Sequence, residues 1–273
     1  MDSLTPIRRW PAIISLVITL TIWFVIPCPP DVTPQAWHLL ALFIGTIAAI
    51  IGKAMPIGAI AIVAIMLVAM TGARYHADQI STARALPALA RAKAAGLAVT
   101  AGCSIHHLTL NEFDIGDYRT FFKLTPPLRS EDDRIAMVEA VMAGAIDVIG
   151  SFHTPQDEED KRLPFEEAAS GAVGLETLLP AATQLYHAGH LDPTALWRAL
   201  SLNPARLLGL EAGRLRPGAP ADLVLFDPDA PFVLDRATLR SKSKNTPYDL
   251  RRMQGRVLAT WVGGREIFTR ETR

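Results

Sequence analysis

The sequence predicts an α-helical membrane segment, followed by an incomplete α/β unit of about three strands and a small C-terminal β unit. Three observations indicate this organisation. Charged residues are nearly absent between positions 10 and 72, strand and helix patterns alternate after that, and glycine, proline and alternating apolar residues mark the last part. We therefore expect domains at residues 1–72, 73–212 and 213–273.

Three uncharged apolar runs account for the predicted membrane segment. They cover residues 10–26, 36–52 and 57–72, and the sequence KAMP at Lys53–Pro56 separates the last two. A membrane-spanning helix takes about 20 apolar residues, and proline cannot continue a helix in register. Two or three spans, or one span with a hairpin, all fit this pattern. We expect an inner or plasma membrane location, with the lipid bilayer as partner.

The residues before the first run bear on orientation. Arg8 and Arg9 favour a cytoplasmic N-terminus. With three spans residue 73 lies outside the cytoplasm, and with two it lies inside, so the side of the soluble part stays open. A cleaved secretory signal is the less favoured alternative, because two further apolar runs follow the first.

The segment from Pro30 to Gly72, which opens PPDVTPQAWHLLALFIG, resembles the first helices of the divalent anion–sodium symporter family. That family moves dicarboxylates such as succinate and citrate. Its substrate and sodium sites lie in later hairpins and broken helices, and nothing after residue 72 resembles them. The resemblance therefore implies an anchor and not a transporter.

The middle of the chain alternates between helix and strand signals. STARALPALARAKAAG begins with a serine cap and ends at Gly96, and SEDDRIAMVEAVMAG carries acids in its first turn. The expected helices are residues 81–96, 130–144, 174–189 and 192–210, and the expected strands are 75–80, 97–102 and 146–151. This alternation is typical of a parallel sheet.

A small β unit is predicted after residue 212. The sequence ADLVLFD at 221–227 alternates like a strand. Residues 256–268 contain two short strands around Gly263 and Gly264, which is a strong hairpin signal.

Six motifs in this order resemble dihydroorotases of the long bacterial type. They are GLAVTAGCSIHHLTL, FKLTPPLRSEDDR, AIDVIGSFHTPQDEEDKRLPFEEAASGAVGLETLLP, LNPARLLGL, GRLRPGAPADLVLFDP and SKSKNTPY, and the resemblance covers about residues 74–268. It implies a (β/α)₈ barrel with a small β-sandwich, so the middle unit is derived from a TIM barrel. The family interconverts carbamoyl-aspartate and dihydroorotate in pyrimidine biosynthesis, with zinc activating water.

The same resemblance places other residues where the family has catalytic groups. QIST puts Gln79 at a metal-ligand histidine, and FHTPQ puts Phe152 at a metal-ligand aspartate. By weaker correspondence, the substrate-binding positions hold Thr125, Gln156 and Gly171. Glutamine is a poor zinc ligand and phenylalanine is none. We therefore expect no catalytic residue, no metal ligand and no zinc.

The remaining motif residues have structural interpretations. His106, His107 and His153 are expected to be structural, because adjacent side chains point apart. Glu176 suits a cap at a helix start. We expect solvated loops at the charged runs 156–162 and 241–245. We expect the two cysteines of the chain to be inert thiols.

Several functions remain open on this sequence. The first is a truncated, membrane-anchored, dihydroorotase-like protein that is inactive alone. The second is a non-catalytic structural partner of aspartate carbamoyltransferase. A symporter fragment and a chimeric gene product are the further alternatives. Open sheet edges favour self-association. Nucleic acid is not expected, since lysine plus arginine and aspartate plus glutamate each number 27.

Overall fold

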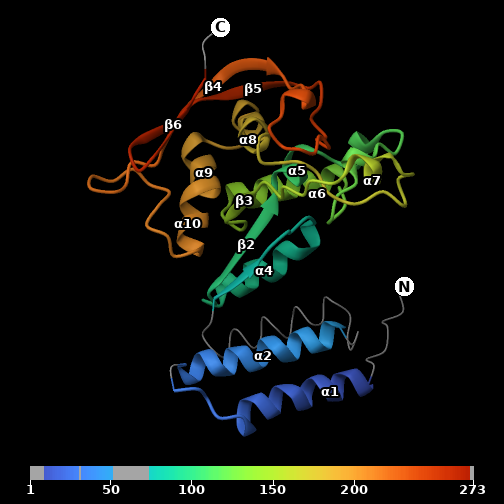
Figure 1. Cartoon of the computed structure of the whole chain (residues 1–273), viewed down its shortest axis with the longest axis vertical. Coiled ribbons are helices and arrows are strands. Elements are labelled where there is room, and N and C mark those ends of the chain that lie inside the picture. The colour runs from blue at the N-terminus through green and yellow to red at the C-terminus, as the bar shows by residue number, and fades with distance from the viewer. Residues whose placement is uncertain (1–8, 31, 52–73, 271–273) are drawn as a thin grey trace. The chain divides into compact units, whose positions relative to one another are not determined.

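The computed structural model describes residues 9–30, 32–51 and 74–270 (Figure 1). The chain divides into two compact units. One consists of residues 1–75 with 93–99, and the other of residues 76–92 with 100–273.

The described part of the apolar N-terminus is helical, as its sequence predicts. Helix α1 spans Arg9–Leu20 and continues into a wide π-type turn at Thr21–Val25, and helix α2 spans Pro34–Ile51. Across the described residues, no helix combines the length and the apolar character that crossing a bilayer requires. The third apolar run, at 57–72, lies outside them.

Helices α1 and α2 pack against each other through small residues. The Ser15 hydroxyl donates a hydrogen bond of 2.6 Å to the Gly45 carbonyl oxygen. A Cβ atom at Gly45 would lie 1.8 Å from Thr19 Oγ1. Only glycine allows this close approach, which brings the two backbones together.

The three predicted strands of the α/β unit are all present. They are β1 (Tyr75–Ala77), β2 (Val99–Ser104) and β3 (Val148–Gly150), and they form one sheet in the order β1-β2-β3. Strands β2 and β3 run parallel, with Cys103 opposite Ile149. Both side chains are almost fully buried. Burial raises the pKa of the Cys103 thiol, which keeps the group protonated, as expected of an inert thiol.

The predicted helices of this unit are present in order but shorter, and two short helices that were not predicted, at 105–109 and 158–162, accompany them. They are α4 (Leu86–Ala94), α5 (Ile105–Thr109), α6 (Glu131–Met142), α7 (Glu158–Arg162), α8 (Leu178–His187), α9 (Pro193–Trp197) and α10 (Asn203–Leu207). Helix α6 begins as predicted, because the Ser130 hydroxyl accepts the Asp133 N–H at 3.2 Å. The helix expected at 192–210 is interrupted by a wide turn at Arg198–Leu202.

The C-terminal β unit is an antiparallel sheet. Strands β4 (Leu223–Val233), β5 (Arg252–Val262) and β6 (Arg265–Thr269) lie in that order. The predicted turn joins β5 to β6, with positive φ at both Gly263 and Gly264.

Strand β5 packs directly on helix α8 (Figure 1). The Thr183 hydroxyl lies 2.9 Å from the Gln254 carbonyl oxygen. A Cβ at Gly255 would lie 2.8 Å from both Thr183 Oγ1 and Phe226 Cζ, and this glycine has φ 100°. Glycine is therefore required at the closest approach of sheet and helix.

Candidate functional site

The candidate site lies where the strands of the α/β sheet end. Gln79 follows β1, His106 follows β2 and Phe152 follows β3. In open α/β sheets ligands bind beyond the carboxyl ends of the strands. The sequence-predicted metal-ligand positions, Gln79 and Phe152, therefore stand at the edge where a site belongs.

Both of these residues have a left-handed backbone, with φ 58° at Gln79 and φ 44° at Phe152. For a non-glycine residue this conformation costs on the order of 1–3 kcal/mol, so the surrounding structure must hold it. The hydrogen bonds that follow each residue do so. Ile80 N–H donates to the Gly102 carbonyl at 2.9 Å, and Thr154 N–H donates to the Ala172 carbonyl at 2.8 Å.

A buried hydrogen-bond chain fixes the protonation of His106. The Thr109 hydroxyl donates its only hydrogen to the Ile105 carbonyl at 2.9 Å, so the Tyr248 hydroxyl, 2.6 Å away, must donate to Thr109. The Tyr248 oxygen then accepts from His106 Nδ1 at 3.3 Å. His106 therefore carries its hydrogen on Nδ1 and leaves Nε2 as a bare acceptor.

The His106 ring stays neutral. Its side chain is fully buried, and burial, with a smaller contribution from the charge of His107, lowers its pKa to about 3. Among the described residues, no group makes a hydrogen bond to Nε2. A Cβ at Gly174 would approach Nε2 to 3.2 Å and the Ser151 carbonyl oxygen to 2.1 Å. Glycine at 174 thus preserves the space beside this nitrogen.

The other two motif histidines hold backbone. His107 Nε2 lies 3.1 Å from the carbonyl oxygens of both Pro126 and Pro127, so it carries a hydrogen and donates to them. His153 Nδ1 accepts N–H bonds from Gly174 at 3.2 Å and Leu175 at 3.3 Å. Neither ring nitrogen in these contacts is available to a ligand.

Two of the predicted substrate-binding residues lie together. A Cβ at Gly171, which has φ 137°, would lie 2.9 Å from Gln156 Nε2. The Asn245 side chain connects them, since it donates to the Gly171 carbonyl at 3.0 Å and accepts the Gln156 N–H at 3.4 Å. Thr125 is exposed. The carbonyl of Lys123, two residues before it, accepts the Gly171 N–H at 2.8 Å.

Asn245 was missed by the sequence analysis. The prediction of a solvated loop at 241–245 was wrong for this residue, which is 2% exposed. Its amide satisfies buried backbone groups that no strand pairs, which is why it lies inside. Thr246 and Tyr248, which follow it, are buried as well.

The charged run at 156–162 is largely exposed, as predicted of a solvated segment, except at Lys161. It contains helix α7, and Lys161 within it is 4% exposed. Lys161 Nζ donates to the carbonyl oxygens of Thr120 at 2.9 Å and Ala169 at 2.7 Å. Burial, together with the charge of Lys123, lowers the pKa of Lys161 to about 8. This lysine holds three segments together.

The prediction for Glu176 was also wrong. Its carboxylate does not cap its own helix but accepts the backbone N–H groups of Arg240 at 3.0 Å and Ser241 at 2.9 Å. An ionised carboxylate is a strong acceptor for two adjacent N–H groups, so it anchors the loop that leads to Asn245.

Comparison with known families shows to which family this chain belongs. The sequence pattern of the amidohydrolase family matches residues 51–267. This chain belongs to the amidohydrolase family. The pattern of the sodium:sulfate symporter transmembrane region matches residues 7–93, so the two matches overlap at 51–93.

Curated relatives of this amidohydrolase are dihydroorotases. That of Wolbachia sp. subsp. Drosophila simulans is 39% identical over 203 residues, which are 74% of this chain and 46% of the relative. That of Anaeromyxobacter dehalogenans is 44% identical over 205 residues, which are 74% and 47%. The chain thus spans about half the length of the curated relatives it matches.

Solved structures share the fold. The L-hydantoinase (dihydropyrimidinase) of Arthrobacter aurescens superposes with a TM-score of 0.72 at 25% identity, over 93% of this chain and 55% of that one. A D-hydantoinase of Bacillus sp. AR9 superposes with a TM-score of 0.69 at 23% identity, over 76% of this chain and 47% of that one, and this likeness concerns the fold alone.

The strand ends of this amidohydrolase do not fit a zinc centre. Zinc in proteins takes thiolate, imidazole or carboxylate donors, while Gln79 offers an amide and Phe152 offers no lone pair. Within the described ranges, no group of three or more histidine, cysteine, aspartate or glutamate side chains is placed to hold a metal ion.

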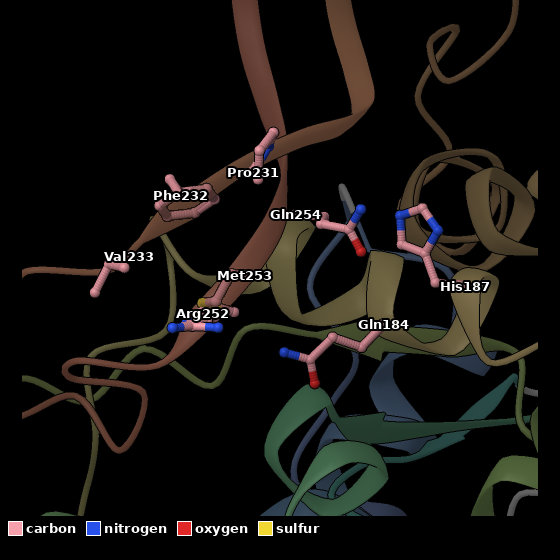
Figure 2. Close-up of a pocket in the computed structure, with 8 residues that line it drawn as sticks. All are labelled: Gln184, His187, Pro231, Phe232, Val233, Arg252, Met253 and Gln254. Atoms are coloured by element: carbon pink, nitrogen blue, oxygen red, sulfur yellow. The ribbon is translucent and has the colours of Figure 1, made fainter.

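Two cavities of this amidohydrolase lie between α8 and the C-terminal sheet. Figure 2 shows one of about 540 Å³, with Gln184 and His187 of α8 on one side and residues 231–233 of β4 and 252–254 of β5 around it. His187 Nε2 bonds the Pro228 carbonyl at 3.0 Å. A second cavity, of about 630 Å³, adjoins the start of α8.

Proposed function

We propose that this amidohydrolase is a dihydroorotase-type chain that holds no catalytic zinc and hydrolyses no cyclic amide by itself. Hydrolysis of dihydroorotate needs a metal-held hydroxide, a base that manages its proton and a cation that binds the substrate carboxylate. The observation that carries the proposal is the identity of the strand-end residues, Gln79 and Phe152. Neither side chain supplies a metal ligand of the required kind or a base.

The backbone at these positions supports the same interpretation. Phenylalanine gains nothing from a left-handed conformation, yet Phe152 adopts one with φ 44°. A strained backbone is usually kept where a side chain must be aimed at a ligand. Its persistence beneath an inert side chain supports descent from a metal-binding ancestor.

The test is zinc content and turnover of the full chain. We expect far less than one zinc per chain after purification in the presence of Zn²⁺, and no ring closure of carbamoyl-aspartate. The Phe152→Asp variant, with and without Gln79→His, is the matched comparison, and near-ultraviolet circular dichroism verifies that each sample is folded. Stoichiometric zinc together with ring closure by the unmodified chain would refute the proposal.

We further propose that such a chain acts as a structural partner of aspartate carbamoyltransferase. The likeness to dihydroorotases supports this, and so do β1 and β3, which each pair on one side only within the described sheet. The test is co-purification of the transferase with the tagged full chain and sedimentation of the mixture. If a folded sample sediments separately from the transferase, a partnership is rejected, and a self-associated chain is the alternative result.

The N-terminal match supports a membrane location for the full chain. The matched symporter region, residues 7–93, is a transmembrane region in its own family. We expect the chain to remain with the membrane fraction after extraction with alkaline carbonate, which removes peripheral proteins. Release into the supernatant would contradict an anchor and would leave the proposal about zinc untouched.

A further inference from the structure

The second cavity carries a concentration of positive charge that the proposed function does not use. It has a volume of about 630 Å³ and lies among the start of α8, strands β4 to β6 and the loop at 234–240. Three arginines line it, Arg240, Arg256 and Arg270. A volume of roughly 300–1,000 Å³ is usual for small-molecule sites.

Each arginine stacks on an aromatic ring of the cavity. The guanidinium carbon of Arg256 lies 4.5 Å from the ring centre of Phe232. Those of Arg240 and Arg270 lie 5.4 and 5.9 Å from the ring centre of Phe268. Stacking engages the flat face of a guanidinium and leaves the N–H donors at its edge available.

These donors are largely unused. Within the described residues, no ion pair engages any of the three arginines, and the one side-chain hydrogen bond they make runs from Arg270 Nε to the Val257 carbonyl at 3.0 Å. The positive charge of the cluster also affects its own members. Partial burial and the charge of Arg270 both lower the pKa of the Arg256 guanidinium.

Among the described residues, the two acids of the cavity make no ion pair with these arginines. Glu176 accepts the N–H groups of Arg240 and Ser241, and the Asp235 carboxylate accepts the Ala237 N–H at 2.8 Å. Both carboxylates are thereby committed to backbone. Three guanidinium groups and two carboxylates leave one net positive charge in a cavity whose wall is partly apolar.

We propose that this cavity binds a small organic anion, with a carboxylate or phosphate group held by the three arginines and an apolar body held by the surrounding side chains. A planar guanidinium edge binds either group through paired hydrogen bonds. The apolar body would contact a hydrophobic wall formed by Leu179, Phe226, Leu239 and Val257. This site is independent of the strand-end residues and of the question of zinc.

The experiment is isothermal titration of the full chain with four probes: benzoate, phenyl phosphate, inorganic phosphate and the neutral benzyl alcohol. We expect benzoate or phenyl phosphate to bind with a Kd on the order of 1 mM or below. Benzyl alcohol should not bind, and inorganic phosphate should bind more weakly than phenyl phosphate. The preference between benzoate and phenyl phosphate identifies which anionic group the cavity takes.

Matched variants locate the binding. Arg256→Met and Arg270→Met should each weaken it about tenfold or more, because each removes a charge-assisted contact. Arg252→Met is the control, since Arg252 lies on the same strand but lines the other cavity (Figure 2). Equal binding of benzyl alcohol and benzoate, no binding of either anion, or full affinity in the arginine variants would each overturn the proposal. The probe comparison uses the unmodified chain, so it decides even where a variant fails to fold.

Discussion

Replacing Tyr248 by phenylalanine removes one hydroxyl from the interior and leaves the ring in place. Tyr248 is 0% exposed, and its hydroxyl joins Thr109 Oγ1 at 2.6 Å to His106 Nδ1 at 3.3 Å. The variant creates no cavity of consequence, because the two side chains differ by one oxygen. Any loss of stability therefore reports the hydrogen-bond chain itself.

The expected loss follows from what each partner retains. Thr109 still donates to the Ile105 carbonyl, so it loses only an incoming donor, a change of about 1 kcal/mol. The Nδ1–H group of His106 loses its acceptor in a fully buried position, which costs about 2 kcal/mol. We expect Tyr248→Phe to lower the free energy of unfolding by about 3 kcal/mol.

Urea unfolding of the full chain, followed by circular dichroism at neutral pH, measures this change. Tyr118→Phe is the control, because Tyr118 is 73% exposed and its substitution should cost less than about 0.5 kcal/mol. Thr109→Val breaks the same bond, so the double variant should cost less than the sum of the two singles. A loss below about 0.5 kcal/mol for Tyr248→Phe, or strict additivity, would refute the chain of donors described for His106.

Three further predictions concern buried groups of this unit. His106 has an unfolded-state pKa near 6.5 and a folded-state pKa of about 3, so the unfolded state binds the proton first as pH falls. The free energy of unfolding should therefore decrease as pH drops below 6.5, and His106→Gln should reduce this decrease in unfolding experiments across pH. Gly174→Ala forces a Cβ to 2.1 Å from the Ser151 carbonyl and should cost about 3 kcal/mol or more, whereas Gly189→Ala, with open space but φ 73°, should cost about 1 kcal/mol in thermal unfolding. Asn245→Ala leaves buried backbone groups without a hydrogen-bond partner and should lower the free energy of unfolding in urea by about 2 kcal/mol. Lys242 is exposed, so Lys242→Ala should leave that free energy almost unchanged.

The parts of the fold that the sequence predicts are those with local causes. The three strands were found because short apolar runs lie between capped helices, and the β5–β6 turn because Gly263 and Gly264 stand together. The wide turn that interrupts the helix at 192–210 also has a local cause, because Pro204 has no N–H to donate and its ring crowds the preceding turn. A contact beside it has no local cause. Asn203 donates to the carbonyl of Asp147, 56 residues earlier, at 2.8 Å, and no local pattern reveals that contact.

The same distinction explains the buried polar residues. Lys161 lies in a run of charges that is typical of a solvated loop, and its two acceptors belong to segments 41 and 8 residues away. Asn245 bonds a carbonyl 74 residues earlier. Periodicity reports which face of an element is apolar, but it contains no information on which unpaired backbone groups a distant loop will bring inside.

The strand ends combine a feature that the sequence reveals with one that distant contacts determine. The sequence alone shows that Gln79 and Phe152 differ from the family's residues at these positions. It does not predict their left-handed backbone, because neither residue type favours that conformation. The hydrogen bonds after each residue, to Gly102 and Ala172, impose that conformation irrespective of the side chain. A scaffold that fixes its backbone in this way can lose a ligand without losing its shape. For this reason, a chain of the amidohydrolase family can keep the fold of an enzyme after the chemistry of its strand ends has changed.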